Sequence, residues 1–142
     1  MTLVVDAAPL VAAADRRDRL QPQVESLLRS EPGPLVVTSP VTAEVDYMLG
    51  RRLGHRARLA FLEDLAAGRF LLVPLDESDY GKILELERQY EDLDVGLAEL
   101  STVVAAARYG TTKILTFDER HFRALRSLDG LQFTVLPADA AG

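Results

Sequence analysis

The chain has 142 residues, of which 48% are hydrophobic and 27% charged, with a net charge of −6 from 16 basic and 22 acidic side chains. This length and balance predict a single domain with its own core, and the acidic charge argues against broad electrostatic attachment to nucleic acid. The absence of cysteine excludes disulfides, thiolate catalysis and cysteine-ligated zinc, and two histidines leave little for a histidine-rich metal centre. No apolar run is long enough to span a membrane, and the apolar N-terminus contains Asp6 and lacks a basic region. We therefore expect a cytoplasmic protein without a signal peptide.

In chain order, the sequence predicts a strand at 3–5, a helix at 18–30, a strand at 35–38, helices at 40–53 and 55–67, a strand at 70–73, helices at 77–90 and 95–108, a strand at 113–117, a helix at 119–127 and a strand at 132–136. The strands are unbroken apolar runs, which is typical of parallel sheets covered on both faces. The fold class expected is α/β, a three-layer α/β/α domain with a central, mainly parallel sheet of about five strands. We expect residues 1–137 to form this single domain and residues 138–142 to be a disordered tail.

Two of the predicted strands are followed by an aspartate, Asp6 after the first and Asp118 after the strand at 113–117. Ligands of open parallel sheets bind beyond the carboxyl ends of the strands, so these two side chains can converge although they lie far apart in the sequence. An aspartate after a strand can also simply cap the next helix, and the sequence leaves this alternative open for each residue taken singly.

Three further acids belong to predicted helices. Glu44 borders the apolar stripe of the helix at 40–53, and the alternative is an acid that complements the helix dipole. Glu99 lies within the apolar face of the helix at 95–108, and the alternative is an edge glutamate whose carboxylate reaches water. Asp94 precedes this helix and is expected to be its N-cap.

If these acids met at one crevice, their charges would repel one another unless a hard divalent cation neutralised them. Ligation by oxygen atoms alone favours Mg²⁺ or Mn²⁺ over zinc. The residues therefore predict a Mg²⁺ (or Mn²⁺) site at the carboxyl edge of the sheet.

Three segments, "VVDAAPL", "VTSPVTAEVDYML" and "DVGLAELSTVVAAARYGTTKILTFDERHF", together resemble the PIN-domain ribonucleases, and specifically the VapC-type toxins of bacterial toxin–antitoxin pairs. The similarity extends over nearly the whole chain in order and spacing. It implies that Asp6, Glu44, Glu99 and Asp118 are the catalytic acids, with Asp6, Glu99 and Asp118 as metal ligands. The family usually has aspartate where this chain has Glu99, and Asp94 could supplement or replace that ligand.

The resemblance also implies a function and partners. We expect a toxin endoribonuclease that hydrolyses RNA phosphodiester bonds with a divalent metal, is inhibited by a small VapB-like antitoxin, and forms a homodimer and a higher assembly with that antitoxin. Transfer RNA and ribosomal RNA both occur as substrates in the family. The helices at 18–30 and 40–67 are expected to form the groove that receives the antitoxin, and the basic run with Arg51, Arg52 and Arg56 is expected to touch RNA phosphates.

Two other interpretations compete with this one. The first, suggested by Glu99, is a catalytically weak PIN domain that acts as an RNA- or protein-binding module. The second is a phosphoacceptor receiver domain, which needs a lysine at the carboxyl end of a late strand, whereas Lys113 begins its strand. Near Asp118, Thr116 could steady the site by hydrogen bonding, but we interpret it as an ordinary strand residue. We interpret His121 as a turn residue rather than a ligand.

Overall fold

The computed structural model describes residues 2–140, so the last two residues of the tail predicted at 138–142 lie outside the described residues. The elements are β1 (Leu3–Val5), α1 (Ala7–Ala13), α2 (Gln21–Ser30), β2 (Leu35–Thr38), α3 (Ser39–Arg52), α4 (His55–Ala66), β3 (Leu71–Val73), α5 (Glu77–Gln89), the 3-10 helix η1 (Glu91–Leu93), α6 (Leu97–Arg108), β4 (Lys113–Leu115), α7 (Glu119–Ala124) and β5 (Thr134–Leu136).

The five strands form one parallel sheet in the order β3-β2-β1-β4-β5. The central strand β1 pairs with β2 on one side and with β4 on the other, with Val4 opposite both Val36 and Ile114. The pairing with β4 extends past the strand end, where the N–H of Asp6 donates to the carbonyl oxygen of Leu115 at 2.9 Å. This register brings the segments that follow β1 and β4 side by side at the carboxyl edge.

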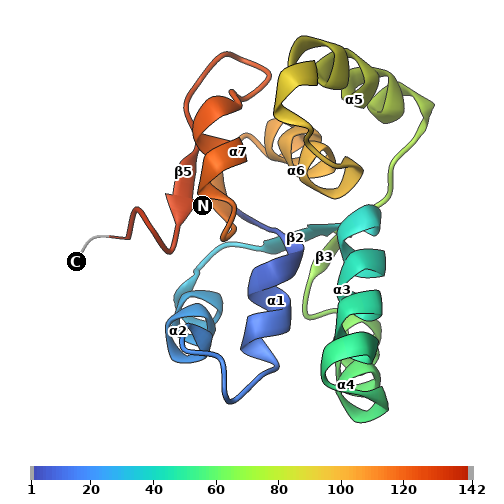
Figure 1. Ribbon diagram of the computed structural model, residues 1–142, viewed down its shortest axis with the longest axis vertical. Coiled ribbons are helices and arrows are strands. Elements are labelled where there is room, and N and C mark those ends of the chain that lie inside the picture. Colours follow the sequence, from blue (N-terminus) through green and yellow to red (C-terminus); the bar gives the residue numbers. More distant parts are fainter. Residues whose placement is uncertain (1, 141–142) are drawn as a thin grey trace.

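The two faces of the sheet carry different layers of helices. Successive side chains of a strand point to opposite faces, so Val4 packs in one core with residues of α5, α6 and α7, while Leu3 and Val5 pack in the other core with residues of α1 to α4. Figure 1 shows these two groups of helices on opposite sides of the sheet. The predicted three-layer α/β/α class with a parallel sheet of five strands is confirmed.

The helix α1 was not predicted from the sequence. It has only seven residues, and its N-cap is Asp6, whose Oδ1 accepts a hydrogen bond from the N–H of Ala7 at 2.9 Å. Its side chains are nearly all buried, so its sequence has no polar face to reveal a helical period. The helix α2 is shorter than predicted at its start, α6 begins at Leu97, and α7 ends at Ala124.

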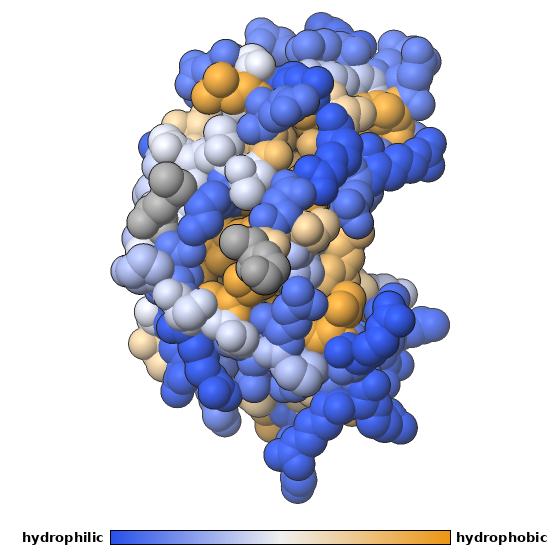
Figure 2. All heavy atoms as spheres, turned by 90° about the vertical axis from the view of Figure 1, so that its left-hand side faces the viewer, coloured by the Kyte–Doolittle hydropathy of each residue, from blue (hydrophilic) through white to orange (hydrophobic). Residues whose placement is uncertain are grey.

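The end of the described chain is folded back rather than extended. Residues 137–140 form a turn in which the N–H of Asp139 donates to the carbonyl oxygen of Val135 at 2.7 Å, and the side chain of Asp139 pairs with Arg123 at 2.6 Å. The space-filling view shows a notch between the upper and lower parts of the molecule, with apolar residues inside it and hydrophilic residues over both parts (Figure 2). Across residues 2–140, no helix combines the length and apolar character that a membrane span requires.

Candidate metal centre

Asp6 is held rigidly at the end of β1. Its side chain is almost fully buried, and besides the N–H of Ala7 it accepts a hydrogen bond from the hydroxyl of Thr116, with 2.7 Å between Oγ1 and Oδ2. The pKa of this carboxyl is raised to about 6, mainly by burial; the two hydrogen bonds oppose this shift, and the neighbouring charges of Glu99 and Glu44 add to it. Burial makes the charged form of Asp6 unfavourable, and a bound cation would stabilise that charged form.

Thr116 joins the two acids that follow β1 and β4. Its hydroxyl donates to Asp6 and also accepts from the N–H of Asp118 at 3.0 Å. The interpretation of Thr116 as an ordinary strand residue is therefore wrong, because its side chain is buried within the site and fixes the neighbouring acids.

Asp118 lies at the N-terminus of α7 and is also the N-cap of that helix. Its Oδ1 accepts from the N–H of His121 at 3.1 Å, and its Oδ2 lies 2.6 Å from Nδ1 of the same histidine. His121 lies within the helix α7 and not in a turn between elements. The interpretation of His121 as a turn residue is therefore wrong.

Glu99 occupies the third position of α6 after the N-cap, which is Gly96. Its Oε2 accepts from the N–H of Gly96 at 2.8 Å, so the side chain folds back over the start of its own helix. An aspartate here would be one methylene shorter. The length of Glu99 thus lets one oxygen cap the helix while the carboxylate still borders the site.

Glu44 is exposed on the second turn of α3, and its side chain borders the same site as Asp6, Glu99 and Asp118. Partial burial raises the pKa of Glu44, and the charge of Glu99 raises it further. The four predicted catalytic acids and several apolar side chains line one hollow of about 420 Å³. Its lining residues are Asp6, Ala7, Ala8, Glu44, Met48, Glu99, Phe117 and Asp118.

Asp94 does not join this group. It is exposed, follows η1 with a left-handed φ of 53°, and is absent from the lining of the hollow. The expectation that it caps the helix is wrong, since Gly96 is the N-cap of α6. Left-handed backbone favours Gly, Asn and Asp, which gives a local reason for an aspartate at this position.

The donor set fits a hard divalent cation. Four carboxylates from four different elements face one hollow, and within residues 2–140 no lysine or arginine forms an ion pair with any of them. Glu99, Asp118 and His121 each offer one ligand atom within 4.8 Å of the others. Uncompensated carboxylates repel one another, and a cation bound between them relieves that repulsion. The acidic cluster can therefore bind a divalent metal.

Lys113 lies at the other edge of the sheet. It begins β4, and its Nζ lies 2.7 Å from Oε2 of Glu31. A receiver-type site would need this charge beside the carboxyl edge, so the position of Lys113 argues against the receiver interpretation.

The basic run lies along α3 and the start of α4, beyond the acidic hollow. Arg51, Arg52 and Arg56 are all exposed, and the guanidinium of Arg51 lies over the ring of Tyr47, 5.8 Å from its centroid. Arg51 is seven residues from Glu44, which places it on the same face of α3, about 10 Å further along the helix.

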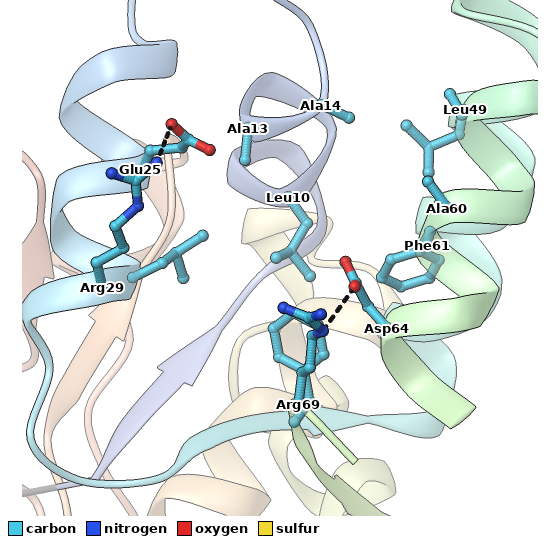
Figure 3. A pocket seen from close by; sticks show the side chains of 13 residues that line it. Leu10, Ala13, Ala14, Glu25, Arg29, Leu49, Ala60, Phe61, Asp64 and Arg69 are labelled. Carbon is cyan, nitrogen blue, oxygen red and sulfur yellow. Dashed lines mark hydrogen bonds and ion pairs between the residues drawn. The ribbon is translucent and has the colours of Figure 1, made fainter. Parts of the chain in front are cut away.

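A second hollow, of about 410 Å³, lies between α1, α2, α3 and α4 (Figure 3). Leu10, Leu49 and Phe61 form apolar walls. Two ion pairs also line it, between Arg29 and Glu25 on α2 at 3.1 Å, and between Arg69 and Asp64 at 2.9 Å. The predicted groove helices contribute to it, and the unpredicted α1 completes it.

The comparisons with known proteins agree with this geometry. The family model of the PIN domain matches residues 3–128. Ribonuclease VapC26 of Mycobacterium tuberculosis (strain ATCC 25618 / H37Rv) is 36% identical over 135 residues, which are 95% of this chain and 100% of that protein. The crystal structure of VapC20 of M. tuberculosis, a sarcin–ricin loop cleaving toxin, superposes with a TM-score of 0.74 at 17% identity, covering 79% of this chain and 86% of that one. VapBC2 of Rickettsia felis, bound to a DNA fragment from its promoter, gives 0.67 at 17% identity, covering 95% and 98%.

The fold and the four converging acids define a PIN domain, and the chain belongs to that family. Within the family it is a relative of the VapC-type ribonucleases, as the resemblance in sequence predicted.

Proposed function

We propose that this chain is a toxin endoribonuclease that hydrolyses RNA phosphodiester bonds with a divalent metal, and that it acts as a single PIN domain over residues 1–137. The observation that carries the proposal is the convergence of Asp6, Glu44, Glu99 and Asp118 on one hollow in a PIN-family chain. The name of the relative VapC26, a ribonuclease, supports the same activity.

The four acids have different roles, which follow from their surroundings. Asp6, Glu99 and Asp118 hold the cation, Mg²⁺ or Mn²⁺, since oxygen ligands without thiolates suit these hard ions. When bound, the ion supplies charge that polarises the scissile phosphate and acidifies an attacking water. Glu44 is exposed at the mouth of the hollow, and its raised pKa suits a group that positions this water and accepts its proton.

RNA reaches the hollow along α3. Arg51 shares a face of this helix with Glu44, and exposed Arg52 and Arg56 extend the positive charge toward α4. Phosphate contacts of this kind position the strand without reading its sequence. The substrate class is transfer or ribosomal RNA, as in the family resemblance.

A small VapB-like antitoxin holds the enzyme inactive. The apolar hollow between α1, α2, α3 and α4 has the size for one or two large apolar side chains of an antitoxin helix, and its ion pairs offer charged contacts at the rim. The VapBC2 structure of R. felis contains such a partner for that toxin.

We also propose a homodimer in the cytoplasm, with higher assembly when the antitoxin binds. Tyr80 and Leu84 lie one turn apart on α5 and are about half exposed, which leaves apolar area for a second copy. Light scattering of the purified chain, alone and with antitoxin, measures both assemblies.

The test of the proposed activity is RNA cleavage by the chain prepared free of antitoxin, with Mg²⁺, with Mn²⁺ and with EDTA. Cleavage should require metal, map to defined RNA ends, and be lost in Asp6→Asn and Asp118→Asn. Asp129→Asn, an exposed acid outside the hollow, is the matched control and should cleave normally. Metal-dependent RNA binding without cleavage would instead support the binding-module interpretation. Cleavage that persists in Asp6→Asn would refute the proposed site.

A further inference from the structure

His121 contacts both carboxylate oxygens of Asp118. Its backbone N–H donates to Oδ1 at 3.1 Å, and its ring Nδ1 lies 2.6 Å from Oδ2. No role is given to this histidine by the function proposed above. The side chain is largely buried, with 16% exposed, so its ring is held between neighbours rather than free in solvent.

The second ring nitrogen is also engaged. Nε2 of His121 lies 2.8 Å from the carbonyl oxygen of Leu93, the last residue of η1. A carbonyl oxygen and a carboxylate oxygen both only accept, so a hydrogen bond at each ring nitrogen needs a hydrogen on Nδ1 as well as on Nε2. The bond fixes the orientation of the ring and directs Nδ1 at the carboxylate of Asp118.

This pair of bonds links two parts of the metal centre. Leu93 lies in the segment that leads into α6, where Glu99 caps its own helix through Gly96. Asp118 lies at the start of α7. His121 therefore connects the segment before α6, which carries the third acid, to the start of α7, which follows the fourth acid.

The geometry argues against direct ligation by the ring. Asp6, Glu44, Glu99 and Asp118 line the hollow, and His121 does not. Its Nδ1 is 3.9 Å from Oε2 of Glu99 but only 2.6 Å from Oδ2 of Asp118, so the nitrogen nearest the acids is already engaged by the fourth acid.

We propose that His121 is a positioning residue of the metal centre, which holds Asp118 in its ligating orientation while Leu93 holds the ring. The inference rests on the metal site of the proposed function. Mg²⁺ requires near-ideal octahedral ligand positions, and loss of a partner that orients a ligand typically lowers metal affinity by about 10- to 100-fold.

Two substitutions separate the two ring bonds. The amide nitrogen of His121→Asn lies near the position of Nδ1 and keeps a donor for Asp118. The amide nitrogen of His121→Gln lies near the position of Nε2, so it keeps the bond to Leu93 and loses the one to Asp118. His55→Gln, an exposed histidine at the start of α4, is the matched control.

The measurement is Mn²⁺ affinity by titration calorimetry and electron paramagnetic resonance, without RNA. His121→Gln should bind Mn²⁺ about 10- to 100-fold more weakly than the wild type, His121→Asn should lose less, and His55→Gln should match the wild type. The inference is overturned if His121→Gln binds Mn²⁺ as tightly as the wild type, or if both His121 variants lose the same amount of Mn²⁺ affinity. A ¹⁴N coupling of His121 to bound Mn²⁺ also overturns it, because it would identify a direct ligand.

Urea unfolding in EDTA identifies a variant that fails to fold. If such a variant does not fold, ¹⁵N shifts of the wild-type His121 with Mg²⁺ test the inference instead. Both ring nitrogens should be protonated, and a coordinated or unprotonated Nδ1 refutes the inference. The proposed function fails separately. A chain whose Mn²⁺ affinity falls in His121→Gln but that never cleaves RNA keeps this inference, and a chain that cleaves RNA with unchanged metal affinity in His121→Gln loses it.

Discussion

Replacing Asp6 by asparagine should stabilise the metal-free protein at neutral pH. Asp6 is the most deeply buried of the four acids at the site, with 5% of its surface exposed. Asparagine keeps an oxygen for the N–H of Ala7 and an amide for the hydroxyl of Thr116, which can reverse its direction. The substitution therefore removes the buried charge and leaves the local hydrogen bonds in place.

The size of the effect follows from the pKa of Asp6, which burial raises from 3.8 to about 6. At about 1.4 kcal/mol per pH unit, this difference corresponds to about 3 kcal/mol. Below pH 3.8 the carboxyl is protonated in both states, and its contribution to stability is fully present. Between pH 3.8 and about 6 the unfolded chain releases the proton before the folded one, so this stability is lost as the pH rises.

The assay is thermal unfolding of wild type and Asp6→Asn in EDTA at a series of pH values from 3.5 to 7.5. As the pH rises over this range, the stability of Asp6→Asn relative to the wild type should grow by about 3 kcal/mol, or roughly 10 °C in Tm for a domain of this size. Saturating Mn²⁺ at pH 7.5 should stabilise the wild type and not Asp6→Asn, by about 2.7 kcal/mol at 100 times Kd. A Tm difference between the two proteins that does not change with pH would refute the reasoning.

Three further predictions concern the neighbouring residues. Thr116→Val should raise the pKa of Asp6 further, because the hydroxyl lowers it, and should move the midpoint of Mn²⁺ binding to higher pH, whereas Thr116→Ser should not. Glu99→Gln keeps an oxygen for the N–H of Gly96, so calorimetry should find Mn²⁺ affinity reduced by about tenfold or more with an unchanged urea midpoint; a large loss of stability would contradict this account of Glu99. Arg51→Ala should weaken RNA binding and lower its salt dependence by about one phosphate contact, measured by filter binding, and an unchanged salt slope would remove Arg51 from the RNA path.

The four acids could be predicted because each leaves a local signal. Asp6 and Asp118 each end an apolar run, and the carboxyl edge of a parallel sheet brings such residues together whatever their distance in sequence. Glu44 and Glu99 interrupt or border apolar stripes of predicted helices. The roles of these residues as metal ligands came from the family resemblance, and they stay a prediction until metal binding is measured.

The residues around the acids could not be predicted in the same way. Thr116 suits a strand by its branched side chain, and only the pairing of β4 with β1 places its hydroxyl beside Asp6. His121 depends on Leu93, which is 28 positions earlier and carries no polar side chain, because the contact is to its backbone carbonyl. Asp94 was misassigned because a left-handed residue before a helix has the same sequence signature as an N-cap.

The pairing of β1 with β4 has a consequence for when the protein becomes active. The hydrogen-bonded side chains of Asp6 and Thr116 are 110 positions apart in the chain. The contacts between β1 and β4 can therefore form only after the last quarter of the sequence has begun to be synthesised. A ribosome adding about 5–20 residues per second needs roughly 6–22 s to cover that distance. A nascent chain therefore carries its first acid for that time without a complete site. For a protein proposed to cut RNA, this order of synthesis means that the four acids cannot converge before Asp118 has been added to the chain.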